Sequence, residues 1–201
     1  MSEKPWLWLL AGPNGAGKST FAPDLSGTIE NIIGPDTIAA QFLPRALDKA
    51  ALPAGREAIR RIRESLNNQR SFAIETTLSG RFHFQIARDA KSRGWNVGLT
   101  YIGLSTPELA IKRVQKRRRK GGHHVPAADI RRRYKRSLRN LPLFFQLADA
   151  VLVLDNSSTK HPMKMVLEVR RKEIRFRARR LPIWLGRSLK GIRNLQSKTR
   201  Q

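Results

Sequence analysis

Short apolar runs alternate along the chain with longer segments in which apolar residues recur every three or four positions. Runs of the first kind predict buried strands, and segments of the second kind predict amphipathic helices. The expected strands span Trp6–Ala11, 29–33, 71–75, 96–104 and Ala150–Asp155. The expected helices begin near Lys18 and after Thr106-Pro107, and cover residues 54–68, 81–93 and 127–140. Because single strands alternate with helices, we expect an α/β fold: a five-stranded, mostly parallel, doubly wound sheet with helices on both faces.

The composition shifts towards basic residues near the end of the last expected strand. We therefore divide the chain into an α/β domain over residues 1–158 and a basic C-terminal segment over residues 159–201. Within that segment, residues 163–178 predict a basic helix, 181–185 form a short apolar stretch, and 187–201 predict a weakly ordered tail.

A glycine-rich motif lies between the first expected strand and the first expected helix. It fits G-x-x-x-x-G-K-[ST], whose backbone N–H groups cradle phosphates in nucleotide-processing enzymes. In this pattern Lys18 reaches the β- and γ-phosphates of ATP, and the hydroxyl of Ser19 ligates Mg²⁺. The strand–loop–helix context makes an accidental match improbable. The expected nucleotide-binding residues of the loop are Gly12, Pro13, Asn14, Gly15, Ala16, Gly17, Lys18, Ser19 and Thr20.

Carboxylates follow the second and third expected strands. Open α/β sheets bind their ligands at the carboxyl ends of strands, so Asp36 is a candidate for orienting or deprotonating an acceptor hydroxyl. Its alternative role is to cap the helix that starts at Thr37. After the third strand, a carboxylate, three hydroxyls and an arginine are crowded together, which suits a ligand surface better than a core. The expected substrate-binding residues are Asp36, Glu75, Thr76, Thr77, Ser79 and Arg81.

A basic helix, a basic glycine-rich loop and a second basic helix follow the fourth strand, the layout of a mobile lid over phosphates. Arg113 and Arg117 share one helix face and are expected to bind the nucleotide. The lid covers about residues 118–128, and Arg132 and Arg133 lie in the helix after it. The alternative is a solvated basic face. The adjacent His123-His124 pair has no carboxylate or thiol nearby and does not predict a metal site.

The charge of the chain is unusual. Forty Lys and Arg residues stand against fifteen Asp and Glu residues among 201, a formal net charge of +25. Such a surface attracts nucleic acid or anionic surfaces without specificity, and the basic tail is the expected contact. There is no cysteine, no apolar run long enough to cross a bilayer, and no signal peptide pattern, so we expect a cytoplasmic protein.

Other enzymes with this loop fit less well. A GTPase needs an Asn-Lys-x-Asp motif, which does not occur. The segment 78–80 imitates the signature of ABC-type ATPases, but about seventy residues separate it from the strand that would carry their acidic motif, and Asn156 replaces their glutamate. A small kinase requires the loop, an acceptor carboxylate, an acceptor surface and lid cations, and the chain has all four.

Four motifs in order resemble the zeta-toxin-like phosphotransferases: Ala-Gly-Pro-Asn-Gly-Ala-Gly-Lys-Ser, Pro-Asp-Thr-Ile-Ala, Glu-Thr-Thr-Leu-Ser-Gly and Gly-Gly-His-His-Val-Pro with Ile-Arg-Arg-Arg-Tyr. The resemblance covers about residues 5–157. It implies a kinase-type phosphate-loop fold, ATP and Mg²⁺ as cofactors, and phosphorylation of a sugar hydroxyl on UDP-N-acetylglucosamine. It also implies an antitoxin partner, Asp36 as the base, Glu75 as the strand-three glutamate, and Arg132 and Arg133 as lid arginines.

The chain departs from the well-studied toxins of that family in three ways. It is shorter, it has Thr-Thr-Leu-Ser-Gly in place of a Gly-Thr-Gly type run, and its basic tail lies outside the resemblance. Two alternatives therefore stay open. A polynucleotide or RNA 5′-hydroxyl kinase would explain the charge, although aromatic residues for base stacking are sparse. A nucleotide-switched nucleic-acid-binding protein would have no need of Asp36 and Glu75.

Overall fold

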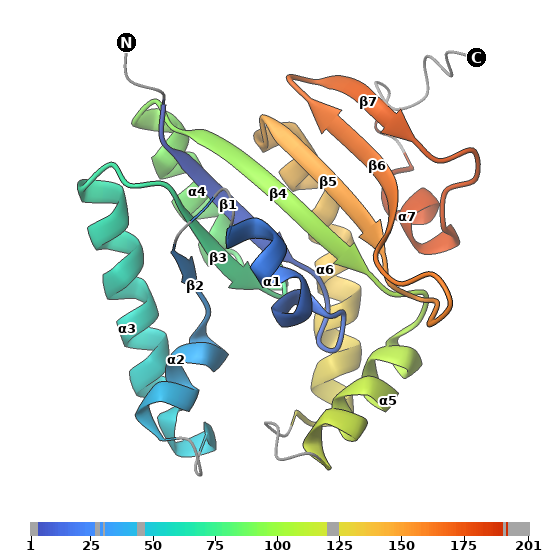
Figure 1. Ribbon diagram of the computed structural model, residues 1–201, viewed down its shortest axis with the longest axis horizontal. Helices are drawn as coiled ribbons and strands as arrows, with labels where there is room; N and C mark the ends of the chain where they lie inside the picture. The colour runs from blue at the N-terminus through green and yellow to red at the C-terminus, as the bar shows by residue number, and fades with distance from the viewer. Residues whose placement is uncertain are drawn as a thin grey trace.

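Seven strands form one twisted sheet in the computed structural model, which describes residues 4–26, 29, 31–43, 47–119, 125–190 and 192 (Figure 1). Their order across the sheet is β2-β3-β1-β4-β5-β6-β7. The first five strands pair in parallel, as expected for strands joined by crossover helices. These strands are β1 (Trp6–Ala11), β2 (Ile32–Ile33), β3 (Phe72–Thr76), β4 (Asn96–Gly103) and β5 (Ala150–Asp155).

Helices cover the two faces of the sheet unequally. Figure 1 shows α1 in front of β1 and β3, and α4 and α6 behind the sheet. Leu7 and Leu9 of β1 point to the rear and join a core with Phe144 of α6, whereas Leu10 joins a second, frontal core with Ile102. The helices are α1 (Lys18–Ser26), α2 (Pro35–Phe42), α3 (Leu47–Asn67), α4 (Phe82–Ser92), α5 (Pro107–Arg118), α6 (Ala127–Leu147) and α7 (Ile183–Ser188).

The main correction to the predicted fold lies after β5. Residues 163–178 do not form the predicted helix but an antiparallel hairpin of β6 (Lys164–Arg170) and β7 (Glu173–Arg177). Strand β6 pairs with β5, so the sheet has seven strands and not five. The tight turn uses Arg171 and Lys172 at φ 49° and 65°, a conformation that side-chain-bearing residues adopt reluctantly. No glycine or asparagine marks it in the sequence, which is why the segment resembles a continuous helix.

The short apolar stretch predicted near residues 181–185 leads into α7. Trp184 is buried against Tyr101, and its ring occupies the space where a Cβ on Gly103 would lie, 2.2 Å away. The indole Nε1 donates a hydrogen bond to Asp155 at the end of β5, 3.2 Å away. The tail predicted from residue 187 falls mostly outside the described residues. Over the ranges that are described, no helix has the length and apolar character needed to cross a membrane.

Two predicted helices extend further than the sequence indicates. The helix expected over 54–68 begins at Leu47, and the helix expected over 127–140 continues to Leu147 through Pro142. Proline usually interrupts a helix, so the Asn140-Leu-Pro142 segment imitates a helix end. These extensions lengthen the cover at the edges of the sheet and leave the position of the phosphate loop unchanged.

Candidate active site

The phosphate loop leaves β1 and turns back into α1 through three glycines. Gly12, Gly15 and Gly17 have φ values of 144°, 73° and 97°, all in the region that favours glycine. Neighbouring atoms also leave no room for a side chain at two of these positions. A Cβ on Gly12 would lie 2.1 Å from the carbonyl oxygen of Ile102, and one on Gly17 would lie 2.8 Å from Nδ2 of Asn156. The loop is therefore held closely between β4 and the segment after β5.

Lys18 is buried at the start of α1 and lies across the loop. Its Nζ donates to the carbonyl oxygens of Gly12 and Pro13, at 3.0 and 3.3 Å, and lies 3.9 Å from Oε1 of Glu75. Burial lowers the pKa of Lys18, while the negative charges of Glu75 and Asp36 act to raise it. The ammonium group is thus paired with Glu75 and lies near enough to Asp36 for the charge of that carboxylate to act on it.

Those carboxylates come from neighbouring elements. Glu75 is the penultimate residue of β3 and lies next to the backbone of Gly34. A Cβ added to Gly34 would lie 3.4 Å from Cβ of Glu75. Asp36 follows Gly34 in the first turn of α2 and is exposed. The N-cap of α2 is Gly34, so Asp36 does not have the capping role that was its alternative. The exposed Asp36 carboxylate can therefore reach a ligand at the carboxyl ends of the strands.

Oxygen ligands for a divalent cation come from two residues. Oγ of Ser19 donates to Glu75, with 3.4 Å to Oε2 and 3.5 Å to Oε1. A hydroxyl and a carboxylate are the hard oxygen ligands that Mg²⁺ prefers, and Mg²⁺ sites of this kind take their other ligands from phosphates and water. The residues therefore fit the metal. Among the described residues no group of three His, Cys, Asp or Glu side chains could hold a metal by itself.

The segment after Glu75 is shaped by its own hydroxyls. Oγ1 of Thr76 accepts a hydrogen bond from the backbone N–H of Leu78 (2.9 Å) and lies 3.2 Å from Nδ1 of His83. Leu78 has a φ of 56°, and its carbonyl oxygen accepts from Asn140 of α6 at 2.8 Å. The sequence did not single out His83 or Asn140. Neither belongs to a local motif, because each meets this turn from another helix.

The other predicted acceptor residues lie on the same turn. The hydroxyls of Thr77 and Ser79 are 2.8 Å apart, and Arg81 is exposed directly before α4. Their predicted role in binding an acceptor stays a prediction.

The predicted arginines divide between two helices. Arg113 of α5 packs beside the loop, since a Cβ on Gly15 would lie 3.1 Å from its Cβ, and Arg117 is close enough for its charge to lower the pKa of Lys18. Burial also lowers the pKa of Arg113. On α6, Arg132 pairs with Asp129 at 2.9 Å, and no contact in the described part of the chain joins Arg132 or Arg133 to the loop.

The lid predicted near residues 118–128 lies between these helices, and its central residues 120–124, including His123 and His124, fall outside the described chain. The start of α6 is fastened to the sheet, because the Tyr134 hydroxyl donates to the carbonyl oxygen of Leu104 at 2.8 Å.

Asn156 is a further residue that sequence analysis missed. Its Nδ2 donates to the carbonyl oxygen of Ala16 in the phosphate loop (2.8 Å), and its Oδ1 accepts from the backbone N–H of Met163 (3.3 Å). Its own backbone N–H donates to Gly103. A single buried amide thus ties the loop, the end of β4 and the segment leading to β6 together. The one feature of the sequence that could have pointed to Asn156 is its position directly after the expected strand that ends at Asp155.

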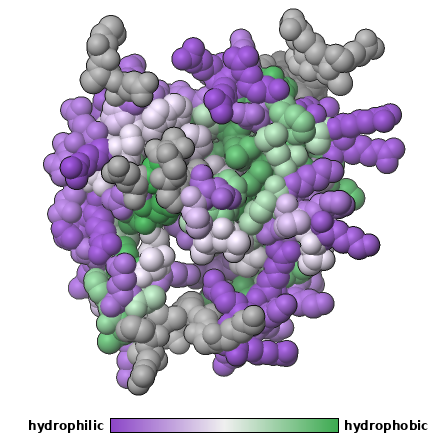
Figure 2. Space-filling view, in the orientation of Figure 1, coloured by the Kyte–Doolittle hydropathy of each residue, from purple (hydrophilic) through white to green (hydrophobic). Residues whose placement is uncertain are grey.

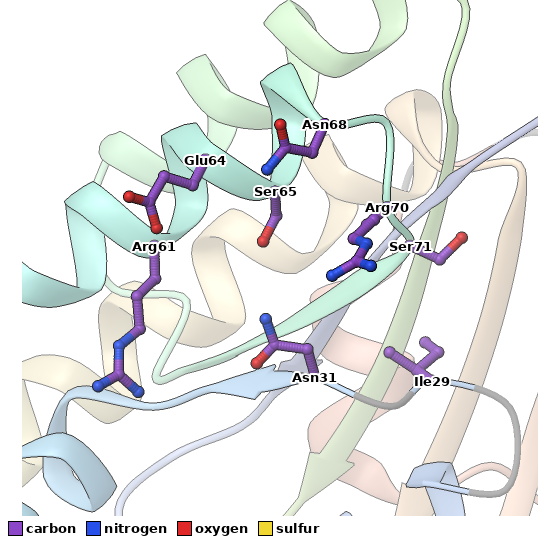
Figure 3. Close-up of a pocket in the computed structure, with 8 residues that line it drawn as sticks. All are labelled: Ile29, Asn31, Arg61, Glu64, Ser65, Asn68, Arg70 and Ser71. Carbon is purple, nitrogen blue, oxygen red and sulfur yellow. The ribbon is translucent and has the colours of Figure 1, made fainter.

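A hollow of about 470 Å³ lies at the amino ends of β2 and β3, away from the phosphate loop (Figure 3). Ser71 and Asn31, at the beginnings of β3 and β2, line it together with the end of α3. Two of its charged groups already pair within α3, Arg61 with Glu57 at 2.7 Å and Glu64 with Arg60. The phosphate loop follows β1 at the carboxyl end of these parallel strands, so the hollow does not belong to the candidate active site.

Comparisons with known proteins agree with this geometry. The family model described as "Zeta toxin" matches residues 1–162. An uncharacterized protein of Haemophilus influenzae is 34% identical over 135 residues, which cover 64% of this chain and 96% of that protein.

Two solved structures share the fold at low sequence identity. A chain in the crystal structure of AvrRxo1-ORF1:-ORF2 with ATP has a TM-score of 0.68 at 16% identity, over 85% of this chain. This chain spans 60% of the length of that one. A chain of the PezAT chromosomal toxin-antitoxin system of Streptococcus pneumoniae has a TM-score of 0.66 at 20% identity, over 94% of this chain and 80% of that chain.

Proposed function

The chain belongs to the zeta toxin family and is a phosphate-loop phosphotransferase, and from this premise we propose that it moves the γ-phosphate of ATP to a hydroxyl of a small acceptor. The observation that carries the proposal is the charge arrangement at one sheet edge. Lys18, on the loop, pairs with Glu75 at 3.9 Å, and Asp36 is near enough to act on the same ammonium. A cation for phosphates, oxygen ligands for a metal and an uncommitted carboxylate thus lie together.

The proposed transfer uses each of these groups once. The backbone of residues 12–20 binds the phosphates of ATP, and Lys18 offsets charge on the transferring phosphoryl group. Asp36 accepts the proton of the acceptor hydroxyl. The acceptor oxygen forms a bond to the γ-phosphorus while the bond from that phosphorus to the β–γ bridging oxygen breaks, and ADP leaves. Ser19 and Glu75 would hold Mg²⁺, and the bound ion would supply positive charge to the phosphate oxygens.

The arginines complete the proposed site in two ways. Arg113 and Arg117 on α5 lie beside the loop and would bind the nucleotide phosphates. Arg132 and Arg133, the lid arginines that the resemblance implies, would offset charge in the transition state.

For the acceptor, we propose a UDP-activated amino sugar. The support is the resemblance of the motifs to zeta toxins, together with Thr77, Ser79 and Arg81 grouped on the turn after Glu75, where hydroxyl and guanidinium groups can bind a sugar nucleotide. A polynucleotide 5′-hydroxyl is the second candidate, favoured by the formal net charge of +25. We also propose an antitoxin partner, since the structure from Streptococcus pneumoniae is that of a toxin-antitoxin system.

The test is phosphoryl transfer by Lys18→Ala from labelled ATP to UDP-N-acetylglucosamine and, in parallel, to a 5′-hydroxyl oligonucleotide. We expect transfer to fall by about a hundredfold or more, because one charged donor to the developing charge is lost. Lys112→Ala, an exposed lysine on α5, is the matched control and should transfer normally. Turnover by Lys18→Ala close to that of the wild type would contradict the assignment.

A further inference from the structure

One half of the sheet has a face without a helix. In front of β5, β6 and β7, on the side where α1 crosses β1, Figure 1 shows no helix in the described part of the chain. We call this surface, together with the first residues of β1 on the same side of the sheet, the open face and define it by the apolar side chains that lie on it. They are Trp6 and Trp8 of β1, Leu152 of β5, Met165 of β6 and Phe176 of β7.

The pairing register places these residues on one side of the sheet. Leu152 is opposite Glu168, and Glu168 is opposite Phe176, so the three side chains form a row. Trp8 pairs with Gly98, and its ring fills the space in front of that glycine, 2.4 Å from an ideal Cβ. Gly98 therefore allows the indole to lie flat over β4.

The aromatic side chains of the open face remain accessible. Phe176 is 38% exposed, and Met165 is equally exposed. Trp6 and Trp8 are half-buried and stacked, with ring centroids 5.4 Å apart and an interplanar angle of 22°. Figure 2 shows hydrophobic colour over this part of the sheet, bordered by strongly hydrophilic side chains.

The border is basic. Between residues 160 and 190 there are eleven Lys and Arg residues and two acids, Glu168 and Glu173. Glu168 lies on the open face itself, between Leu152 and Phe176. Both acids are already paired, with Arg170 at 2.8 Å and with Arg175 at 3.0 Å. The exposed basic residues of the hairpin and the segment after it are Lys164, Arg170, Arg171, Lys172, Arg175, Arg177, Arg179 and Arg180.

We propose that the open face binds single-stranded RNA. A partner that complements it must be anionic along its length and must present flat apolar groups, and unpaired nucleotides supply both features. Sheets that expose aromatic side chains bind single strands by stacking bases on the rings while basic side chains contact the phosphates. The chain's own last residues do not complement this border, because residues 193–201 contain Arg193, Lys198 and Arg200 and no acid.

This surface is separate from the phosphate loop and needs no phosphoryl transfer. The loop lies at the carboxyl ends of β1 and β3, whereas the stacking residues lie on the sheet face across β1 and β5 to β7 (Figure 1). Aromatic residues were sparse in the sequence, but strand pairing places Trp8 and Phe176 on the same side of the sheet, with β4, β5 and β6 between them.

The experiment uses the tryptophans as built-in reporters. Trp95 and Trp184 are buried, so a change in tryptophan fluorescence on binding reports on Trp6 and Trp8. We expect oligouridylate to quench this fluorescence, and heparin, which has the charge but no bases, to bind without quenching it. Lys18→Ala should behave like the wild type in this assay, so failure of the proposed kinase activity and failure of this proposal give different results.

Variants separate stacking from charge. Phe176→Ala should weaken oligouridylate binding by about tenfold, Phe176→Tyr should retain it, and Phe42→Ala, an equally exposed phenylalanine on α2, should not change it. Heparin affinity should be the same in all three. Equal quenching by heparin, equal affinities for Phe176→Ala and Phe42→Ala, or loss of binding in Phe176→Tyr would overturn the proposal. Saturable binding of an acidic peptide with loss of RNA binding would assign the face to a protein partner instead.

Discussion

Asp36 lies exposed in the first turn of α2, close enough to Lys18 for its charge to raise the lysine pKa. A carboxylate at a helix N-terminus contributes about 0.3–1 kcal/mol to stability through the helix dipole. The N-cap of the helix is Gly34 and not Asp36. Its removal should therefore affect chemistry more than folding.

We expect Asp36→Asn to bind ATP with near-wild-type affinity and to transfer phosphate at least about a hundredfold more slowly. The amide keeps the shape of the side chain but cannot accept the proton of the acceptor. Nucleotide affinity by calorimetry and turnover at saturating ATP provide the two measurements. A collapse of ATP affinity, with normal turnover per bound ATP, would make Asp36 a nucleotide or metal residue.

His83 gives a prediction about pH. Burial lowers the pKa of His83 to about 4 from an ordinary value of 6.5. Below pH 6.5 the unfolded chain therefore binds a proton that the folded protein resists, so stability falls as pH decreases from 6.5 to 4. The contribution of this group is at most about 3 kcal/mol.

The measurement is the free energy of unfolding of wild type and His83→Gln by urea at intervals between pH 4 and 7. The variant should lose less stability than the wild type as the pH falls through this range. His161→Gln, at an exposed position, should follow the wild-type curve. Parallel curves for wild type and His83→Gln would show that His83 does not resist protonation.

At the scale of elements, α5 and α6 contribute arginines of different kinds. Arg132 of α6 is exposed and pairs only with Asp129, one turn away, among the described contacts. An exposed pair of this type adds about 0–1 kcal/mol to stability. We expect Arg132→Gln with Arg133→Gln to lower turnover markedly and to shift the melting temperature by no more than a few degrees.

Arg131→Gln is the comparison on the same helix, because Arg131 pairs with Glu108 of α5 at 3.4 Å and was not assigned a catalytic role. It should leave turnover near that of the wild type. A large fall in melting temperature with unchanged kinetics in the double variant would return Arg132 and Arg133 to a structural role.

A helix or strand could be predicted from the sequence where its own residues form a clear pattern. The parallel strands are mostly apolar runs with a glycine or a carboxylate at or next to their carboxyl ends, so their positions could be predicted to within a few residues. The β6–β7 hairpin could not, because its turn consists of Arg171 and Lys172 in place of glycine or asparagine. Strand pairing with β5 outweighs that local cost.

The residues of the candidate site also divide into those that a local motif predicts and those that it does not. The loop residues and Glu75 belong to contiguous motifs and meet as expected, with Lys18 and Glu75 paired. Asn156 and His83 act through contacts with segments distant in the chain or on another element, and a single sequence contains no record of those contacts. The positions of residues in local motifs could therefore be predicted from the sequence, whereas the residues that contact them from other elements could not.

At the scale of the whole molecule, the C-terminal segment is part of the folded body. Trp184 and Leu185 of α7 are buried behind the sheet, and the indole donates to Asp155. Burying a tryptophan and a leucine typically stabilises a fold by several kcal/mol, with about 3–5 kcal/mol for the tryptophan alone. The segment cannot be removed as if it were a loose basic arm.

We therefore expect truncation after Ala178 to lower the free energy of unfolding by at least about 3 kcal/mol and to reduce phosphoryl transfer in proportion to the loss of folded protein. Trp184→Ala should reproduce most of the loss of stability. Ile183→Ala, at a position 73% exposed on the same helix, should be nearly neutral. A truncated protein with wild-type stability would show that α7 contributes nothing to the core.

The hydrogen bond from Asn156 to the carbonyl oxygen of Ala16 also has a consequence for folding during synthesis. The two residues are 140 positions apart, and ribosomes add roughly 5–20 residues per second. Ala16 is therefore synthesised about 7–28 s before the amide that binds its carbonyl oxygen. During that interval the phosphate loop lacks this hydrogen bond, so the ATP site cannot be complete until the chain has been made at least as far as Asn156.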